Sequence, residues 1–267
     1  MATTSLSTAR QARRSQLLWM WGLRLSSLVL LAGVWEYLGR ALDSLLLPTF
    51  AETMRALVAL LASPEVWRSL WVSNQAMLIG YAASLLVGIP LGLIVGRWQQ
   101  AEKFTDIYLN ILLVTPVSAL IPLFIIALGL GLASRVLVVF VFAFIYITVN
   151  TRAGLRNVDP NLLEMAHSFG ATERQLWQKI LLPASLPAMM TGVRVGLGRA
   201  INGMIIVELL LVAVGVGRLI LRYQGDFQAG KVYAVVLVVL VEAVVLMTLV
   251  RRVEKQLVHW ITEVVVE

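Results

Sequence analysis

The sequence contains no cysteine, and histidine is almost absent, with only two residues in 267. A chain without cysteine forms no disulfide and no metal or redox centre that depends on thiolate ligands. The two histidines, His167 and His259, lie far apart and have no cluster of other ligand residues beside them. We therefore expect this chain to bind no metal.

Charged residues are also scarce: they make up 14% of the chain, compared with about 25% of a typical soluble domain. Hydrophobic residues make up 59%, and the mean hydropathy is +0.85. The net charge of +7 could suggest a nucleic-acid partner, but the basic residues are scattered between apolar stretches and form no single stripe. These proportions predict an integral membrane protein embedded in the lipid bilayer, with no nucleic-acid partner.

Long apolar stretches predict an all-α protein with six transmembrane helices, because a helix needs about 20 apolar residues to cross a bilayer. Glycines spaced by four in the second stretch, at positions 88, 92 and 96, are expected to allow close helix packing. No repeat or linker divides the chain, so we expect one membrane domain over residues 1–267. The predicted spans are 17–38, 71–96, 107–130, 135–150, 188–214 and 232–250.

Lysine and arginine predict the orientation of the spans, since cytoplasmic loops carry an excess of both. Their distribution favours both termini in the cytoplasm, which places residues of about 44–70 outside. This segment carries a one-sided apolar pattern that includes Leu57 and Leu61, and it ends near Trp67 and Trp71. We expect an extracytoplasmic amphipathic helix at the membrane surface.

One stretch in the middle of the chain, NLLEMAHSFGATERQLWQKILLP, is polar and helix-forming. Asp159, followed by a proline, predicts a helix start, and Gly170 predicts its end. Thr172, with a glutamine three residues later, predicts the start of a second helix. Two prolines are expected to end that helix: Pro183 and Pro187. The pattern predicts a helix–turn–helix loop over about residues 159–187, and by itself it also fits helices that merely lie on the lipid surface.

Residue identities in this loop favour a more specific interpretation. Their spacing resembles the EAA loop, EAA-x3-G-x9-I-x-L-P, of the permease subunits of binding-protein-dependent ABC importers. The one departure is Met165 in place of the middle alanine, and a flexible thioether can pack there. Six residues match the motif: Glu164, Ala166, Gly170, Ile180, Leu182 and Pro183.

The resemblance extends over about residues 45–255. Stretches such as LLLPTFAETMRAL, VGIPLGLIVGR and ALIPLFIIALGLG look like the nitrate, sulfonate, taurine and bicarbonate branch of that superfamily. It implies the six-helix fold of type I importers in a bacterial plasma (inner) membrane, with the EAA loop docked on an ATPase subunit. It also implies a second permease copy, two ATPase subunits that bind the ATP and magnesium, and an extracytoplasmic solute-binding protein. The implied solute is a small anion or organic anion, although related branches import neutral heterocyclic vitamin precursors.

Polar residues inside spans are costly in lipid and are therefore the first functional candidates. Thr115 and Ser118 lie near two prolines in the third span, where a broken helix would suit either a solute pathway or a simple kink. The candidates in the fifth span are Arg199, Asn202 and Glu208. We expect them either to line the translocation pathway or to hold helices together, and for Glu208 we favour the structural role. Nine residues separate Arg199 from Glu208, out of phase on a helix, so we expect no direct ion pair between them.

Residues 225–232, GDFQAGKV, nearly match a phosphate-binding loop. Val232 stands where the motif requires a hydroxyl that ligates magnesium, and no strand is expected before it, so we expect a turn and no bound nucleotide. A membrane enzyme would need a cluster of nucleophile, base or metal ligands, and none is evident. The alternative to an ABC importer permease is an ATP-independent secondary transporter or channel. Such a protein would be expected to show internal symmetry or a pair of carboxylates within the membrane.

Overall fold

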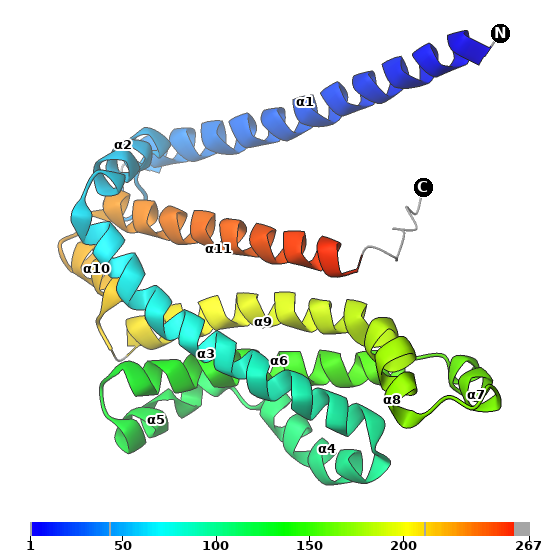
Figure 1. The fold of residues 1–267 in the computed structure, drawn as a ribbon. Helices are drawn as coiled ribbons and strands as arrows, with labels where there is room; N and C mark the ends of the chain where they lie inside the picture. The colour runs from blue at the N-terminus through cyan, green and yellow to red at the C-terminus, as the bar shows by residue number, and fades with distance from the viewer. Residues whose placement is uncertain (1, 43, 211, 259–267) are drawn as a thin grey trace. The chain divides into compact units, whose positions relative to one another are not determined.

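The computed structural model describes residues 2–42, 44–210 and 212–258, with side chains from Trp19 onward except at position 21. His259 lies outside the described residues. Within them the chain is helical and has no strand (Figure 1). The α-helices are α1 (Ala2–Leu42), α2 (Phe50–Leu61), α3 (Pro64–Arg97), α4 (Gln99–Val114), α5 (Ile121–Leu128), α6 (Leu132–Arg156), α7 (Pro160–Ser168), α8 (Glu173–Leu176), α9 (Leu182–Leu210), α10 (Gly215–Gly225) and α11 (Ala229–Leu257). A 3₁₀ helix, Val117–Leu120, precedes α5, and a π-helical turn, Trp177–Leu181, joins α8 to α9.

The prediction of a membrane-spanning helical protein is confirmed. Five helical segments are long and apolar enough to cross a membrane, and a bent pair of helices would make a sixth span. The predicted fourth span, which was short, is longer in the structure, since α6 has 25 residues. The five segments are Gly22–Leu42, Pro64–Arg97, Leu132–Arg156, Glu173–Leu210 and Ala229–Leu257.

The third predicted span is broken. Gln99–Val114 and Val117–Leu128 meet at an angle of 91°. Thr115 and Pro116 between them have extended backbone conformations. Proline cannot donate a backbone hydrogen bond and disfavours helical geometry in the residue before it, so the helix ends at the residue before Thr115.

The chain divides into two compact units. The first contains residues 1–62 and 223–235, and the second contains 63–222 and 236–267. The segment predicted as an amphipathic helix over about 44–70 becomes a turn, then α2 in the first unit, and then the first turns of α3 in the second. Thr49 starts α2 through a capping box with Glu52.

In the first unit, α2 is tied to the end of α1. The indole N–H of Trp35 donates to the Pro48 carbonyl at 3.0 Å, and its ring meets Phe50 edge to face with centroids 5.6 Å apart. The Ala51 N–H donates to the Glu36 carboxylate at 3.0 Å. The Ala51 bond satisfies a free N–H donor in the first turn of α2, and the Trp35 bond satisfies a carbonyl acceptor in the turn that precedes it.

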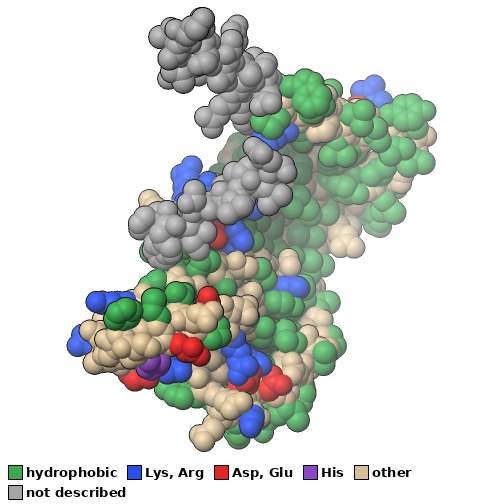
Figure 2. Space-filling view, turned by 90° about the vertical axis from the view of Figure 1, so that its right-hand side faces the viewer, with side chains coloured by type: hydrophobic (Ala, Val, Ile, Leu, Met, Phe, Trp, Pro, Cys, Tyr) green, Lys and Arg blue, Asp and Glu red, His purple; other side chains and the backbone are tan. Residues whose placement is uncertain are grey.

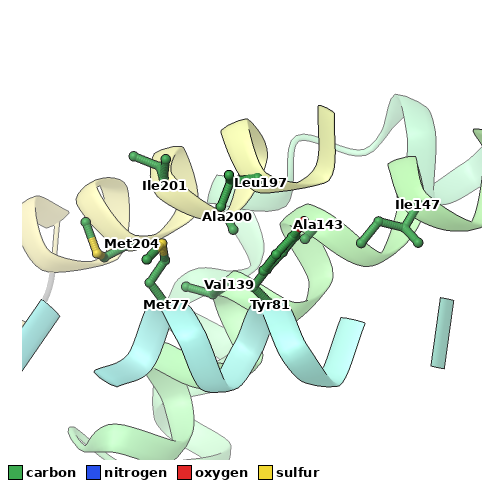
Figure 3. Packing of buried hydrophobic residues seen from close by; sticks show 9 residues of the cluster. All are labelled: Met77, Tyr81, Val139, Ala143, Ile147, Leu197, Ala200, Ile201 and Met204. Carbon is green, nitrogen blue, oxygen red and sulfur yellow. The ribbon is translucent and has the colours of Figure 1, made fainter. Parts of the chain in front are cut away.

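The core of the second unit is formed by α3, α6 and α9, which lie side by side (Figure 1). Met77 of α3, Ile147 of α6 and Met204 of α9 belong to one buried cluster (Figure 3). Half-buried side chains from residues 239–250 of α11 pack against it. The cluster holds together helices that are far apart in the sequence.

Close helix packing at the glycines of α3, predicted from their spacing, is confirmed. A Cβ at Gly92 would lie 2.6 Å from the Thr151 Cβ and 2.7 Å from the Thr148 carbonyl oxygen. Gly88 and Gly96 approach α6 in the same way. The three glycines therefore bring the backbones of α3 and α6 together.

The expectation that Pro183 and Pro187 end a helix is wrong. The chain remains helical from Glu173 to Leu210, with Pro183 as the second residue of α9 and Pro187 inside it. The π-helical turn Trp177–Leu181 interrupts the regular bonding just before Pro183. Proline has no N–H and cannot donate the i→i−4 hydrogen bond of an α-helix. Pro183 is tolerated because the π-helical turn already interrupts that bonding.

Candidate functional site

The predicted helix–turn–helix loop between α6 and α9 is formed by local bonds. Asp159 starts α7 by accepting a hydrogen bond from the Asn161 N–H at 2.9 Å. The helix ends at Ser168, and the chain turns at Gly170, two residues later, which has a φ of +72°. There the Gly170 N–H donates to the His167 carbonyl, and the Ala171 N–H donates to the Ala166 carbonyl at 3.0 Å. A left-handed glycine that closes a helix in this way reverses the chain sharply.

The second half of the loop starts as predicted, at Thr172. Its hydroxyl accepts from the Gln175 N–H, and the Gln175 side chain accepts from the Thr172 N–H at 2.8 Å. The loop is anchored to the ends of the spanning helices by an apolar cluster of Leu155, Val158 and Leu181. Ile180 of the motif is half-buried against this cluster, and Ala166 is buried.

The outer side of α7 is unusually apolar for a surface. Leu162 is 41% exposed, Met165 is 50% exposed and Phe169 is 85% exposed. Glu164, the first motif residue, is also exposed. Figure 2 looks onto the end of the unit that carries α7, where acidic and basic side chains gather. The loop thus presents apolar side chains within a charged surface, an arrangement typical of a protein-binding site.

Two contacts that the sequence did not reveal join this loop to α3. The Arg97 guanidinium lies 3.1 Å from the Glu173 carboxylate. The Trp98 and Trp177 rings pack with centroids 6.5 Å apart. Because α8 continues into α9, these contacts link the loop to two spanning helices.

A cavity of about 220 Å³ lies where the broken span faces α6 and α9. Thr115 and Ser118 from the break line it together with Arg199, so the structure brings three of the predicted pathway residues together. The Arg199 guanidinium carbon lies 4.3 Å from the centre of the Tyr146 ring. This distance is within the range of a cation–π interaction. Tyr146 was missed, because nothing in the sequence near it marks a tyrosine as different from its apolar neighbours.

The other two predicted pathway residues do not line this cavity. Asn202 is exposed one turn further along α9. Glu208 is fully buried and lies 3.5 Å from the Arg135 guanidinium. Its carboxylate accepts hydrogen bonds from the Ser73 hydroxyl at 2.8 Å and from the Gly217 N–H at 3.0 Å. As expected, Glu208 and Arg199 form no ion pair.

The near-match to a phosphate-binding loop covers the turn between α10 and α11. Val232 lies in the first turn of α11, and no strand precedes the turn among the described residues. The residues that the structure describes contain no group of three His, Asp or Glu residues that could hold a metal ion.

Comparison with known proteins identifies this architecture. A family model described as "Binding-protein-dependent transport system inner membrane component" matches residues 88–259. A putative aliphatic sulfonates transport permease protein from Bacillus subtilis is 28% identical over 260 residues, which cover 97% of this chain and 94% of that protein. A taurine transport system permease protein from Escherichia coli is 26% identical, with coverage of 93% and 95%.

A solved structure shares the fold. In the MetNI methionine ABC transporter, captured in inward-facing conformations, the matching chain superposes with a TM-score of 0.61 at 20% identity. The match covers 76% of this chain and 100% of that one.

Proposed function

This chain belongs to the family of binding-protein-dependent transport system inner membrane components, and we propose that it forms the membrane pathway for a small organic or inorganic anion. It is the permease subunit of an ATP-driven ABC importer; it is a transport subunit and not an enzyme, and a separate ATPase polypeptide hydrolyses ATP. The sequence resembles the nitrate, sulfonate, taurine and bicarbonate branch, and within that class the relatives named for aliphatic sulfonates and taurine support a sulfonate solute. The alternative of an ATP-independent transporter or channel is not favoured.

The observation that carries the coupling role is the exposed apolar face of α7. We propose that Leu162, Met165 and Phe169 enter a groove of the ATPase subunit. Burial of apolar side chains is the main source of affinity in most protein interfaces. The motif residues serve this docking in different ways. Glu164 contacts the partner, Ala166 and Gly170 shape the turn, and Ile180, Leu182 and Pro183 fix the loop to α9. ATP and magnesium are bound by the partner.

The complete importer in this proposal contains two copies of this chain, two ATPase subunits and an extracytoplasmic solute-binding protein. Both termini of this chain lie in the cytoplasm of a bacterial cell, and α2 lies outside. The pathway passes Thr115, Ser118, Arg199 and Asn202. Glu208 contributes by holding α3, α6 and α9 together, because its carboxylate is occupied by partners within the protein.

Reconstitution tests the proposal directly. The chain purified alone is expected to hydrolyse ATP no faster than background. Proteoliposomes that contain the permease, its ATPase and a solute-binding protein are expected to take up taurine or ethanesulfonate when ATP is supplied to the ATPase side. ATP hydrolysis by the isolated chain would contradict the permease role. Uptake of a neutral heterocycle with no uptake of either sulfonate would contradict the solute class only.

A further inference from the structure

We propose that Arg199, set on the ring of Tyr146, forms an anion-binding subsite within the pathway, and that the subsite takes the oxyanion group of the solute, such as a sulfonate. This inference rests on the proposed pathway and adds to it the residue that recognises charge. Its starting point is the cavity that Arg199 lines together with Thr115 and Ser118.

The charge of Arg199 has no acidic partner in the described part of the chain. The helix α9 contains two other charged residues, and both are paired: Arg194 lies 3.1 Å from Glu254, and Glu208 lies 3.5 Å from Arg135. No carboxylate oxygen of the described residues lies within the 4 Å ion-pair distance of Arg199. Among the described residues, the group that contacts this charge is the ring of Tyr146, whose centre lies 4.3 Å from the guanidinium carbon.

The subsite lies far from both ends of the spanning helices. Arg199 is near the middle of α9 (Leu182–Leu210), and Tyr146 is near the middle of α6 (Leu132–Arg156). The broken span reaches this level after the 16 residues of α4, a rise of about 24 Å along the helix. An unpaired guanidinium at this depth is costly in hydrocarbon, so a water-filled pathway and a passing anion account for it better than a lipid headgroup does.

The other side chains that line the cavity are suited to binding a small organic oxyanion. The Thr115 hydroxyl is engaged, since it donates to the Ile111 carbonyl at 2.7 Å. The Ser118 hydroxyl has no hydrogen-bond partner among the described residues and is free to donate. A guanidinium offers several N–H donors in one plane, which suits a sulfonate, carboxylate or similar group. Apolar side chains, such as Phe142 and Ile206, line the rest of the cavity and suit a short carbon chain.

The absence of cysteine makes the charge of this subsite measurable. Ser118→Cys would introduce the only thiol of the chain. In membrane vesicles that hold the full chain with its ATPase, that thiol is treated with either of two methanethiosulfonates, one ending in a sulfonate and one in a trimethylammonium group. The thiolate attacks the sulfenyl sulfur, a disulfide forms, and methanesulfinate leaves. The ratio of the two rates cancels changes in the reactivity of the thiol itself and reports the local charge.

We expect the sulfonate reagent to be favoured at Ser118→Cys, and Arg199→Gln to lower the rate ratio by about tenfold. Arg199→Lys should keep most of the preference because it keeps the charge. Arg194→Gln is the matched control, since Arg194 lies on the same helix but is paired with Glu254, and it should leave the ratio unchanged. An exposed thiol at Gln178→Cys should show no dependence on Arg199. An unchanged ratio in Arg199→Gln, or a thiol that reacts with neither reagent, would overturn the proposal.

Uptake assays separate this inference from the proposed function. If taurine or ethanesulfonate is transported and Arg199→Gln changes neither the uptake nor the rate ratio, the subsite is wrong and the importer stands. If the rate ratio depends on Arg199 but neither sulfonate is transported, the subsite stands and the proposed solute class is wrong. With both correct, Arg199→Gln should reduce sulfonate uptake by at least about tenfold, and Arg199→Lys should restore part of it.

Discussion

The Glu208 carboxylate lies 3.5 Å from the Arg135 guanidinium, and the two side chains are 0% and 9% exposed. Arg135 also donates to the Val72 carbonyl at 3.2 Å, and Glu208 accepts from the Ser73 hydroxyl. The pair therefore joins α6 and α9 and ties both to α3. Each charge is acceptable inside the protein only because the other one and these polar groups replace water.

Removing one member of this pair should be severe. Glu208→Ala leaves a buried guanidinium, a hydroxyl and the Gly217 N–H without their acceptor, which should cost about 3–5 kcal/mol of stability. The purified variant should lose its folded, monodisperse state at a clearly lower temperature than the wild type. Glu65→Ala is the control, since the Glu65–Arg222 pair is exposed and should contribute about 0–1 kcal/mol. Equal thermal midpoints for Glu208→Ala and the wild type would refute the structural role.

The packing of α3 on α6 predicts a second stability effect. Gly92→Ala places a methyl group 2.6 Å from the Thr151 Cβ and 2.7 Å from a backbone oxygen, so the helices must separate. We expect a loss of about 1–3 kcal/mol, as in other overpacked sites. Gly33→Ala adds the same methyl group to α1 with nothing within 4 Å, and it should be neutral or slightly stabilising. Thermal stability in detergent compares the two, and similar midpoints would contradict this account.

The turn at Gly170 predicts a defect in coupling to the ATPase without a defect in folding. A Cβ there would meet nothing within 4 Å, so only the φ of +72° opposes a substitution. Gly170→Val should therefore strain the loop by about 1–3 kcal/mol, whereas asparagine tolerates this conformation. We expect Gly170→Val to insert normally but to co-purify poorly with the ATPase and to transport slowly, and Gly170→Asn to behave nearly as wild type. Full assembly and transport by Gly170→Val would mean that the loop is only a surface helix pair.

Charge on the outer side of α7 should matter less. Glu164 is exposed and makes no side-chain ion pair within the described residues. Glu164→Lys should weaken ATPase co-purification more mildly than Gly170→Val, because it changes one surface charge and leaves the loop backbone intact. Glu173→Lys, which breaks the contact of α8 with Arg97, is a useful comparison at a second exposed acidic position. Identical co-purification of Glu164→Lys and wild type across low and moderate salt would exclude Glu164 from the interface.

The proposed orientation predicts which thiols an impermeant reagent reaches. Ser168→Cys lies in the α7 loop and Ala59→Cys lies on α2, and both positions are exposed. We expect labelling of Ala59→Cys in intact cells and labelling of Ser168→Cys only after the cytoplasmic side is opened. Labelling of both from the same side would require a different number of spans between them.

The sequence determined the features that depend on short-range chemistry. Apolar runs of membrane length gave the spans, since the bilayer requires internally bonded helices of a certain length. The α7 loop was predicted for the same reason: Asp159, Gly170 and Thr172 act on backbone groups within a few residues of themselves. The glycines of α3 marked the face that approaches α6, although the sequence did not say which helix would meet it.

Tertiary structure alone decided which polar residues meet. Ser73 and Glu208 are 135 positions apart, and no local sequence pattern indicates that Arg135 forms an ion pair with Glu208. The pattern grouped Arg199 with Glu208 because both are charged residues of one span, yet the fold places the first beside Tyr146 at a cavity and the second in a buried ion pair. The physical reason is that a helix fixes only the direction of a side chain, while its partner depends on the packing of other helices around it. Local bonding therefore specified the spans and the loop, and long-range packing specified the chemistry of the pathway.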